Sequence, residues 1–469
     1  MIEGLKPYAE YKDSGQEWLG KVPAHWDVRR TKLILREVDS RSITGKEQLL
    51  RVSQYTGVTQ RKAADGSDAP DTRAASLVGY KRVSVNDLVI NIMLAWNGSM
   101  GVSRFDGIAS PAYCVYRLNE GAQPWYFHQL FRLPLYKGRI KAVSTGVIES
   151  RLRLYSDDLG RIEAILPPPA EQAAIVRFLD HANRKIDGFI RAKRKLIGLL
   201  NEQKQAIIHR AVTRGLHPDV PLKPSGIPWL GDIPEHWEMR RLKTLSRFVT
   251  SGSRGWARYY SDTGSVFLRI GNISTTSIDL RLNRISYVNQ PAAAEGERTR
   301  AKPGDLLLSI TAQIGAVGVV PDGFGEAFVN QHTALFRLIP NAGVPRWVAY
   351  VLLSRFGKDQ CQALTNGGTK IGLTLGDVRC LVIPMPPKEE QMRAVEEIEL
   401  RTAALTTAIA RTEREIALMQ EYRTRLTADL VTGKLDVREA AAKLPELTVD
   451  AAESAPGEAM EEIETEDVG

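Results

Sequence analysis

The sequence predicts a mixed α/β (α+β) protein with two tandem domains of one repeated design, separated by an antiparallel two-helix coiled coil and related by pseudo-twofold symmetry. Three observations predict this fold class. The length of 469 residues exceeds that of one ordinary domain. A thirteen-residue block occurs twice, and each of the two sequence repeats that it begins ends in a long helical pattern. A composition of 43% hydrophobic and 25% charged residues is globular and argues against wholesale disorder.

The repeated block defines where each copy begins. Residues 14–26 and 225–237 share eight of thirteen positions at a constant offset of 211, and each block is followed by an arginine pair. Pro-Pro and Glu-Gln blocks at 168–172 and 386–391 close the two copies. The predicted divisions are a first domain, a first repeat helix with its linker, a second domain, a second repeat helix and an acidic tail, at residues 1–166, 167–220, 221–385, 386–440 and 441–469.

The two helical patterns have the same length. Glu171 to Thr213 and Glu390 to Thr432 are both 42 residues apart, which fits either a spacer of fixed length or simple inheritance by duplication. Residues 170–215 carry a net charge of +6 and residues 388–437 carry −2, which favours pairing the helices with each other. Steps of three and four predict a coiled-coil seam formed by Ile175, Leu179, Ile186, Leu196, Leu200, Ile207, Ile398, Leu405, Ile409, Ile416, Met419 and Leu426.

The globular halves contain short apolar runs bounded by glycine or proline. Residues 266–273 and 306–310 predict strands, and 125–135 and 345–356 predict short helices. His25 and His236 lie inside the repeated block, where we expect a packing or capping role rather than a catalytic one.

The net charge of +8 combines two opposite parts. Residues 441–469 hold nine acidic residues and one lysine, so this tail carries −8 and the body before it +16. A body of this charge favours a polyanionic partner, although an ordinary solvated basic surface remains an alternative. We expect the tail to be disordered and solvating.

Compartment and catalysis are predicted from absences in the sequence. Three cysteines without metal-type spacing fit a reducing compartment, and the sequence has neither an export signal nor an apolar run of 18 residues. We therefore expect a cytoplasmic protein. The phosphate-binding, dinucleotide, metalloprotease, esterase and amino-methylating motifs are missing, so we expect no catalytic, cofactor or metal site in this chain.

Polar loops rich in arginine, amide and aromatic residues are the candidates for DNA contact. Arginine can pair with guanine, and Gln or Asn with adenine. The candidates in the first half are Arg51, Ser53, Gln54, Tyr55, Gln60, Arg61, Trp96 and Asn97, and those in the second half are Ser253, Arg254, Trp256, Arg258, Tyr259, Arg269, Asn330 and Gln331. Residues 96–99 and 330–332 are predicted to occupy equivalent places in the two halves. For each residue alone, an ordinary solvated loop is an equally good interpretation.

The Trp-Leu-Gly and Ile-Pro-x-His-Trp motifs, the Pro-Pro and Glu-Gln helix starts, and the Val-Thr-Gly-Lys-Leu-Asp segment at 431–436 closely resemble the specificity subunit of type I restriction-modification enzymes. The resemblance covers residues 8–440, and the acidic tail departs from it. It implies two target-recognition domains that each read half of a bipartite DNA site, with a coiled coil that fixes the spacer. It also implies two methyltransferase subunits with S-adenosylmethionine for adenine N6 methylation, and restriction and motor subunits that use ATP and Mg.

Two other classes of function remain open from the sequence. A stand-alone sequence-specific DNA-binding regulator could use the same doubled architecture. A protein–protein scaffold without a DNA role is the third class. The recognised bases, the spacer length and the presence of a nuclease subunit do not follow from the residues.

Overall fold

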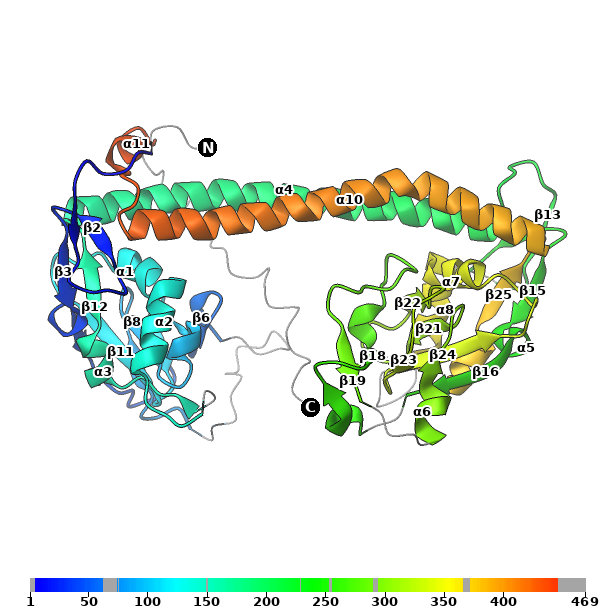
Figure 1. Cartoon of the computed structure of the whole chain (residues 1–469), viewed down its shortest axis with the longest axis horizontal. Helices are drawn as coiled ribbons and strands as arrows, with labels where there is room; N and C mark the ends of the chain where they lie inside the picture. The colour runs from blue at the N-terminus through cyan, green and yellow to red at the C-terminus, as the bar shows by residue number, and fades with distance from the viewer. Residues whose placement is uncertain are drawn as a thin grey trace. The chain divides into compact units, whose positions relative to one another are not determined.

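The repeated blocks fold into two units of the same construction. The structure is a computed structural model and describes residues 5–61, 74, 76–148, 151–227, 229–252, 255–289, 294–365 and 372–445. The first unit is Met1–Arg191 with Ile416–Gly469, and the second is Ala192–Glu415 (Figure 1). Each unit therefore contains one globular domain and parts of both long helices, whereas the predicted divisions run in order along the chain. The mixed α/β fold with two domains and long coiled-coil helices is confirmed.

The central sheet of the first unit is antiparallel, with the strand order β4-β11-β8-β9. Its strands are β4 (Leu35–Glu37), β8 (Leu88–Asn91), β9 (Met100–Val102) and β11 (Tyr113–Leu118). Smaller two-stranded sheets surround it: β1 (Tyr11–Asp13) with β2 (Lys21–Pro23), β3 (Asp27–Arg30) with β12 (Glu163–Leu166), β5 (Leu50–Ser53) with β6 (Gly57–Gln60), and β7 (Lys81–Val83) with β10 (Gly107–Ala109). The helices are α1 (Pro124–Phe131), α2 (Pro134–Val143) and α3 (Ser156–Arg161), with 3-10 turns η1 (Thr31–Leu33) and η2 (Ala95–Asn97).

The second unit has an equivalent central sheet and a larger second sheet. The central order is β16-β24-β21-β22, and the second sheet is β17-β19-β18-β23-β20. The strands are β13 (Leu222–Pro224), β14 (Asp232–Pro234), β15 (Glu238–Arg241), β16 (Ser246–Ser251), β17 (Tyr260–Ser261), β18 (Ser265–Leu268), β19 (Ser286–Val288), β20 (Arg300–Ala301), β21 (Leu306–Ser309), β22 (Val317–Val319), β23 (Ala327–Val329), β24 (Thr333–Leu338) and β25 (Val382–Met385). The shorter helices are α5 (Leu242–Leu245), α6 (Ala294–Thr299), α7 (Pro345–Leu353), α8 (Arg355–Thr365) and α9 (Leu375–Cys380), with 3-10 turns η4 (Trp256–Tyr259) and η5 (Ile270–Asn272).

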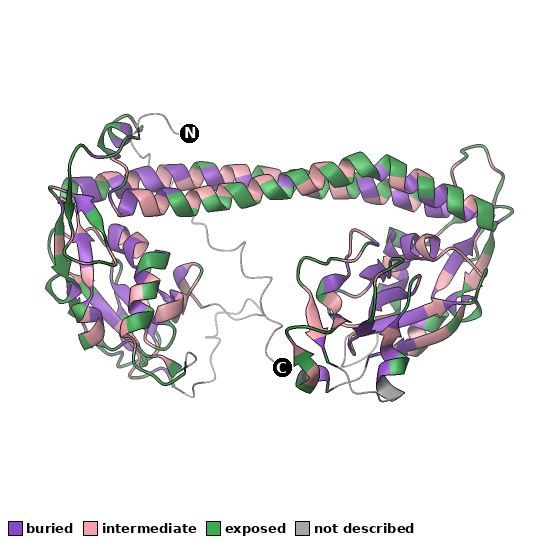
Figure 2. Cartoon of the chain, in the orientation of Figure 1, coloured by how far each residue is buried: buried purple, intermediate pink, exposed green. Residues whose placement is uncertain are grey.

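The structure refines the predicted short elements. The helix predicted over 125–135 is two helices, because Pro134 begins α2 and cannot continue the hydrogen-bonding ladder of α1. The strand predicted over 266–273 ends at Leu268, where η5 turns the chain. Strands β8 and β21 are buried at every residue, which explains the three apolar residues that begin each of them (Figure 2).

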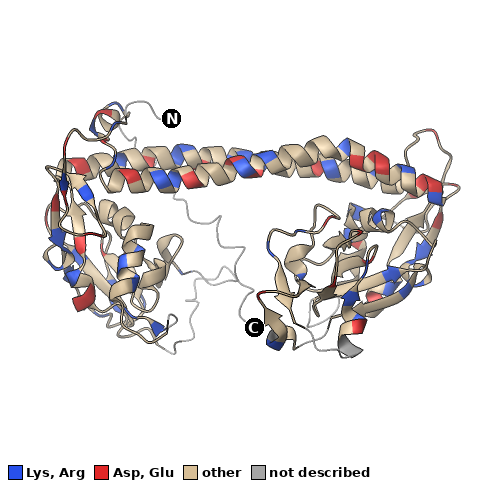
Figure 3. Cartoon of the chain, viewed as in Figure 1, with Lys and Arg blue, Asp and Glu red and all other residues tan. Residues whose placement is uncertain are grey.

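The two long helices pair antiparallel within each unit. They are α4 (Pro169–Arg214) and α10 (Lys388–Val431), 46 and 44 residues long. In the first unit Arg423 of α10 pairs with Asp187 of α4. In the second unit the Lys193 amine lies 2.7 Å from the Glu415 carboxylate, and Lys204 donates to the Thr406 hydroxyl at 3.1 Å. Opposite charges thus face each other at two levels, and Figure 3 has both signs interspersed along α4 and α10.

The seam of the coiled coil follows the predicted rhythm in α10 but shifts in α4. Buried or partly buried positions from the prediction are Ile175, Leu179, Ile186, Leu200, Ile398, Leu405, Ile409, Ile416, Met419 and Leu426. The prediction of Leu196 as a seam residue is wrong, because this leucine is 40% exposed. Ile207 is only partly buried, whereas its neighbour Ile208 is fully buried. The seam runs through Lys193 and Lys204, whose amines have partners across the interface. Because lysines occupy two seam positions, the apolar residues of this stretch do not fix the register of α4 by themselves.

The second repeat helix ends at Val431, next to Thr432, where the sequence pattern predicts its end. Gly433 adopts a left-handed φ of 76° that closes the helix end, and the rest of the predicted division up to residue 440 is not part of this helix. The chain then bridges to Lys6 at Asp436 and forms α11 (Arg438–Ala442), whose Ala441 is buried. The structure thus describes the predicted tail as far as residue 445, and 446–469 lie outside the described residues.

Candidate nucleic-acid interface

The repeated sequence block forms an anchor between each globular domain and its long helix. In the first unit Trp26 donates its indole N–H to the Glu171 carboxylate at 2.8 Å, and His25 Nε2 lies 2.6 Å from the same group. The Tyr8 hydroxyl also donates to Glu171, at 3.1 Å. Burial and the Glu171 charge raise the pKa of Tyr8 above its ordinary value, so this hydroxyl stays a donor. The carboxylate at the start of α4 therefore gathers three side chains from the N-terminal segment.

The second unit repeats this arrangement. Glu390 accepts from the Trp237 indole at 3.0 Å and lies 2.8 Å from His236 Nε2. The neighbouring glutamines are equivalent too: Gln172 and Gln391 each donate to a proline carbonyl five residues earlier, at 2.7 and 2.8 Å. The histidines, tryptophans, glutamates and glutamines of the repeat therefore build the scaffold, and His25 and His236 have the packing role expected of them.

Two of the candidate segments lie together in the first unit. The turn between β5 and β6 contains Gln54, whose side-chain oxygen accepts a hydrogen bond from the Asn97 amide of η2. Trp96 donates to the Met93 carbonyl at 3.2 Å, and the Lys141 amine lies 5.5 Å from the centre of its ring. Tyr55, at the tip of the turn, is 47% exposed. A polar and aromatic surface with adjacent basic residues results, which suits contact with a nucleic acid.

The remaining candidates of the first unit lie on the same hairpin. Arg51 of β5 donates to the Thr59 hydroxyl at 3.2 Å, and Gln60 and Arg61 follow at the end of β6. The Ser53 hydroxyl accepts the Tyr55 backbone N–H at 3.1 Å, which shapes the turn. The prediction therefore selected one local structure, although its members lie in two separate stretches of sequence.

Trp256 is the clearest correction in the second unit. Its side chain is only 6% exposed and packs against Phe267, Val288 and Phe328. It is a core residue, because η4 turns the indole inward beneath the second sheet. Arg258 and Tyr259 of the same turn remain at the surface, and the Arg258 guanidinium lies 4.8 Å from the Tyr259 ring centre. Ser253 and Arg254 lie outside the described residues.

Asn330 is a second correction. It is buried, and its side-chain oxygen accepts from the Thr333 hydroxyl at 3.0 Å and the His332 backbone at 3.3 Å, so it holds a turn rather than facing solvent. Gln331 is partly exposed and contacts His332, 2.9 Å between their side-chain nitrogens.

The predicted equivalence of residues 96–99 and 330–332 is wrong. The first segment joins β8 to β9, whereas the second precedes β24, the counterpart of β11. The segment of the second unit that corresponds to 96–99 is the connection between β21 and β22.

Arg269 does have a counterpart in the first unit. Leu49 forms a parallel bridge with Ile108, and Phe267 pairs in parallel with Phe328. Arg51 and Arg269 each follow two residues after the bridged position, so they occupy the same place in the two units. The loops after these arginines then differ: the first unit forms a tight hairpin, and the second forms η5 and a longer connection.

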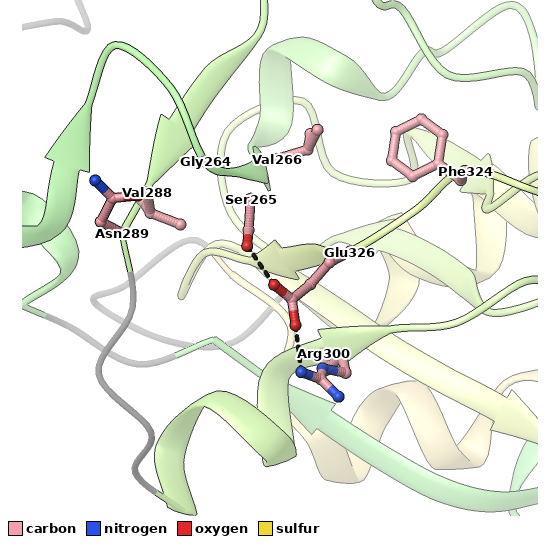
Figure 4. A pocket seen from close by; sticks show the side chains of 8 residues that line it. All are labelled: Gly264, Ser265, Val266, Val288, Asn289, Arg300, Phe324 and Glu326. Carbon is pink, nitrogen blue, oxygen red and sulfur yellow. Dashed lines mark hydrogen bonds and ion pairs between the residues drawn. The ribbon is translucent and has the colours of Figure 1, made fainter.

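A cavity of about 680 Å³ opens beside the second sheet. Among the residues that line it are Ser265, Arg300, Phe324 and Glu326 (Figure 4). Glu326 accepts from the Ser265 hydroxyl at 2.5 Å and pairs with Arg300, and these contacts lower its pKa. The acid and base on the rim are thus already paired with each other.

The comparisons with known proteins agree with this construction. Residues 234–414 match the family model described as type I restriction modification DNA specificity domain. The chain is 23% identical to the type I restriction enzyme MjaX specificity subunit of Methanocaldococcus jannaschii, over 93% of this chain and 100% of that protein. It is 24% identical to the EcoBI specificity subunit of Escherichia coli, over 78% of this chain and 80% of that one. The similarity to type I restriction enzyme specificity subunits thus extends along most of the chain.

The fold agrees with a solved member of a type I system. A chain from a structure of type I restriction-modification complex assembly and conformational transition superposes with a TM-score of 0.56 at 17% identity, covering 87% of this chain and 98% of that one. At this identity the likeness concerns the fold. In the part of the chain that the structure describes, no helix has the length and apolar character needed to cross a membrane. Among the same residues, no group of three or more His, Cys, Asp and Glu side chains is placed to hold a metal ion.

Sequence reasoning missed several residues of the candidate interface. Arg132 donates to carbonyls of both candidate segments of the first unit, and Lys358 reaches a loop carbonyl in the second. His128 is partly buried beneath the hairpin, and its desolvation lowers its pKa to about 3, so the ring is neutral. Single basic residues on short helices carry no motif, so only the three-dimensional contacts reveal them.

Proposed function

We propose that this chain is the DNA sequence-specificity subunit of a type I restriction-modification complex, in which each unit reads one half of a bipartite, asymmetric site. The observation that carries the proposal is the contrast inside the repeat. The anchor residues Glu171 and Glu390 have matching partners, while the loops after Arg51 and Arg269 differ. Two copies of one scaffold with different loops suit two half-sites of different sequence.

Within the first unit, the Gln54 and Asn97 pair is the best candidate for reading adenine. Their contact uses the acceptor of Gln54 and a donor of Asn97. Among the described contacts, the Gln54 amide nitrogen and the Asn97 side-chain oxygen have no other partner. These are the donor and acceptor types that recognise adenine in the major groove. In the second unit we assign contact to Arg258, Tyr259 and Gln331, and to Arg254 on the sequence alone.

The long helices set the distance between the half-sites in this proposal. Lys193–Glu415 and Lys204–Thr406 fix which residues face each other. Residues 195–201 and 408–414 lie between these contacts on opposite helices. Deleting both segments removes one heptad from each helix, or roughly 10 Å, which corresponds to a spacer shorter by about three base pairs.

The chemistry belongs to partner subunits in this proposal. This chain is non-catalytic and cytoplasmic, docks two methyltransferase subunits, and joins restriction and motor subunits on double-stranded DNA. The methyltransferases supply S-adenosylmethionine for adenine N6 methylation, and the motor subunits supply ATP and Mg chemistry. The names of the similar proteins, which are subunits of type I restriction enzymes, support this assignment.

Methylation mapping tests the proposal. The chain is expressed with candidate methyltransferase subunits in a host without adenine methylation, and the modified sites are read by long-read sequencing. We expect one asymmetric bipartite site, and a spacer shorter by about three base pairs in the heptad-deletion variant. An unchanged spacer would refute the role of the helices. Tight binding of one site by the chain alone, without recruitment of a methyltransferase, would instead support a stand-alone regulator.

A further inference from the structure

Arg132 forms hydrogen bonds with both candidate loops of the first unit. Its guanidinium donates to the carbonyls of Gly98 and Met100 at 3.0 and 2.6 Å, and of Gln54 and Tyr55 at 2.9 and 2.6 Å. A weaker contact reaches the Ser53 carbonyl at 3.4 Å. In the described part of the chain, its hydrogen bonds go to backbone carbonyls rather than to a carboxylate. The fork of N–H donors thus holds the hairpin turn and the connection after η2 in one geometry.

The backbone beneath Arg132 leaves little room for adjustment. Gly57 opens β6 with a left-handed φ of 81°, and a Cβ on Gly101 of β9 would lie 2.9 Å from the Gly57 Cα. The His128 ring closes the same space, with its Nδ1 accepting the Val102 backbone N–H at 3.1 Å. The hairpin therefore rests directly on the central sheet, and a shift of its turn requires breaking the Arg132 contacts.

A basic residue also contacts a loop in the second unit, but from another position in the fold. Lys358 of α8 donates to the Thr275 carbonyl at 2.8 Å, in the connection that follows η5. Its stem also lies against the turn after β21, since a Cβ on Gly315 would be 3.7 Å from the Lys358 Cγ. Lys358 therefore contacts the connection after β18 and the turn after β21, as Arg132 contacts the turn after β5 and the connection after β8. Burial lowers the pKa of both cations, that of Arg132 to about 10, so Arg132 remains charged at neutral pH.

We propose that Arg132 and Lys358 are positioning residues for sequence recognition, each fixing the loops of its own unit without contacting DNA. The inference rests on the proposed function and deepens it. Because the cations hold backbone atoms, their removal changes no candidate side chain but makes the loop that carries it more mobile. Selectivity is therefore lost at one half-site, and the other half-site is still read normally.

The experiment uses the full chain assembled with its methyltransferase subunits. Arg132→Met, Arg132→Lys, Lys358→Met and Lys358→Arg are compared with Arg161→Met and Arg355→Met, which replace strongly exposed cations of the two units. Methylation rates are measured on a library in which each base of both half-sites is varied, and hydrogen exchange checks that each unit is folded. Binding is also measured as a function of salt concentration.

We expect Arg132→Met to reduce discrimination on the order of tenfold in one half-site only. Lys358→Met should do the same in the other half-site, while Arg132→Lys keeps part of the discrimination. The salt dependence of binding should stay unchanged, because no phosphate contact is lost. Unchanged discrimination, equal loss in both half-sites with folded protein, or a reduced salt slope would each overturn the inference. If a methionine variant unfolds, the charge-retaining variants decide by the same criteria. If the unmodified complex itself shows no site selectivity, the proposed function fails instead.

Discussion

The first unit supports its candidate loops with a partly buried arginine and a tight hairpin, whereas the second uses a lysine and a larger second sheet. Yet both units build the same anchor of tryptophan, histidine and glutamate at the start of a long helix. Both also pair an aspartate before a central strand with an arginine, Asp87 with Arg117 and Asp305 with Arg337. The parts of the repeat that stay alike are therefore scaffold, and the parts that differ surround the candidate recognition loops.

The strongest way to test this comparison is to remove the anchor carboxylate from each unit. Glu171 is buried and has Tyr8, His25, Trp26 and Arg438 around it, whereas the Glu390 side chain is 20% exposed and has two partners. Glu171→Ala should destabilise the first unit by about 3–5 kcal/mol, because buried donors lose their acceptor. Glu390→Ala should cost about 1–3 kcal/mol in the second unit. Hydrogen exchange resolved by unit measures both, and equal losses would contradict the difference between the anchors.

A second test concerns the position of the seam in α4. Ile208 is fully buried in the core of the second unit, and its neighbour Ile207 is only partly buried. Ile208→Ala should cost about 2–4 kcal/mol through lost burial and the cavity that remains. Ile207→Ala should cost clearly less in the same denaturant titration. A larger loss at Ile207 would restore the seam predicted from the sequence.

These contrasts explain what the sequence could predict. The repeat fixed the two domains and helices, because duplication leaves identical blocks such as Trp26 and Trp237 at one offset. The candidate hairpin was found because Gln54 and Arg51 are close in sequence. Trp256 and Asn330 were misplaced because composition does not reveal whether a loop residue faces inward. Arg132 was missed because its partners are backbone carbonyls, which carry no side-chain signature.

Low pH should destabilise the first unit through His128. Unfolded His128 binds a proton below its ordinary pKa of 6.5, whereas burial delays protonation in the folded unit to about pH 3. The stability that depends on the neutral ring is complete above 6.5 and is lost as the pH falls from 6.5 towards 3. The loss approaches about 1.4 kcal/mol for each pH unit. His128→Gln removes this titration, so its unfolding free energy should depend less on pH than that of the unmodified chain. An identical pH dependence would exclude His128 as the cause.

The smallest effect on folding should come from replacing Arg258, the exposed residue of a turn in the second unit that also contains the buried Trp256. It is exposed and lies over the Tyr259 ring, two residues after the buried Trp256. Arg258→Ala should change the unfolding free energy by less than about 0.5 kcal/mol. If the guanidinium contacts a phosphate, the slope of log binding constant against log salt concentration should fall by about 1. Trp256→Ala should instead unfold the region around β18 and β23, because its loss leaves a cavity under the sheet. A destabilised Arg258→Ala variant, or an unchanged salt slope in a folded one, would show that this turn does not contact DNA. The DNA contacts of the second unit would then come from the loops around Arg269 and Gln331.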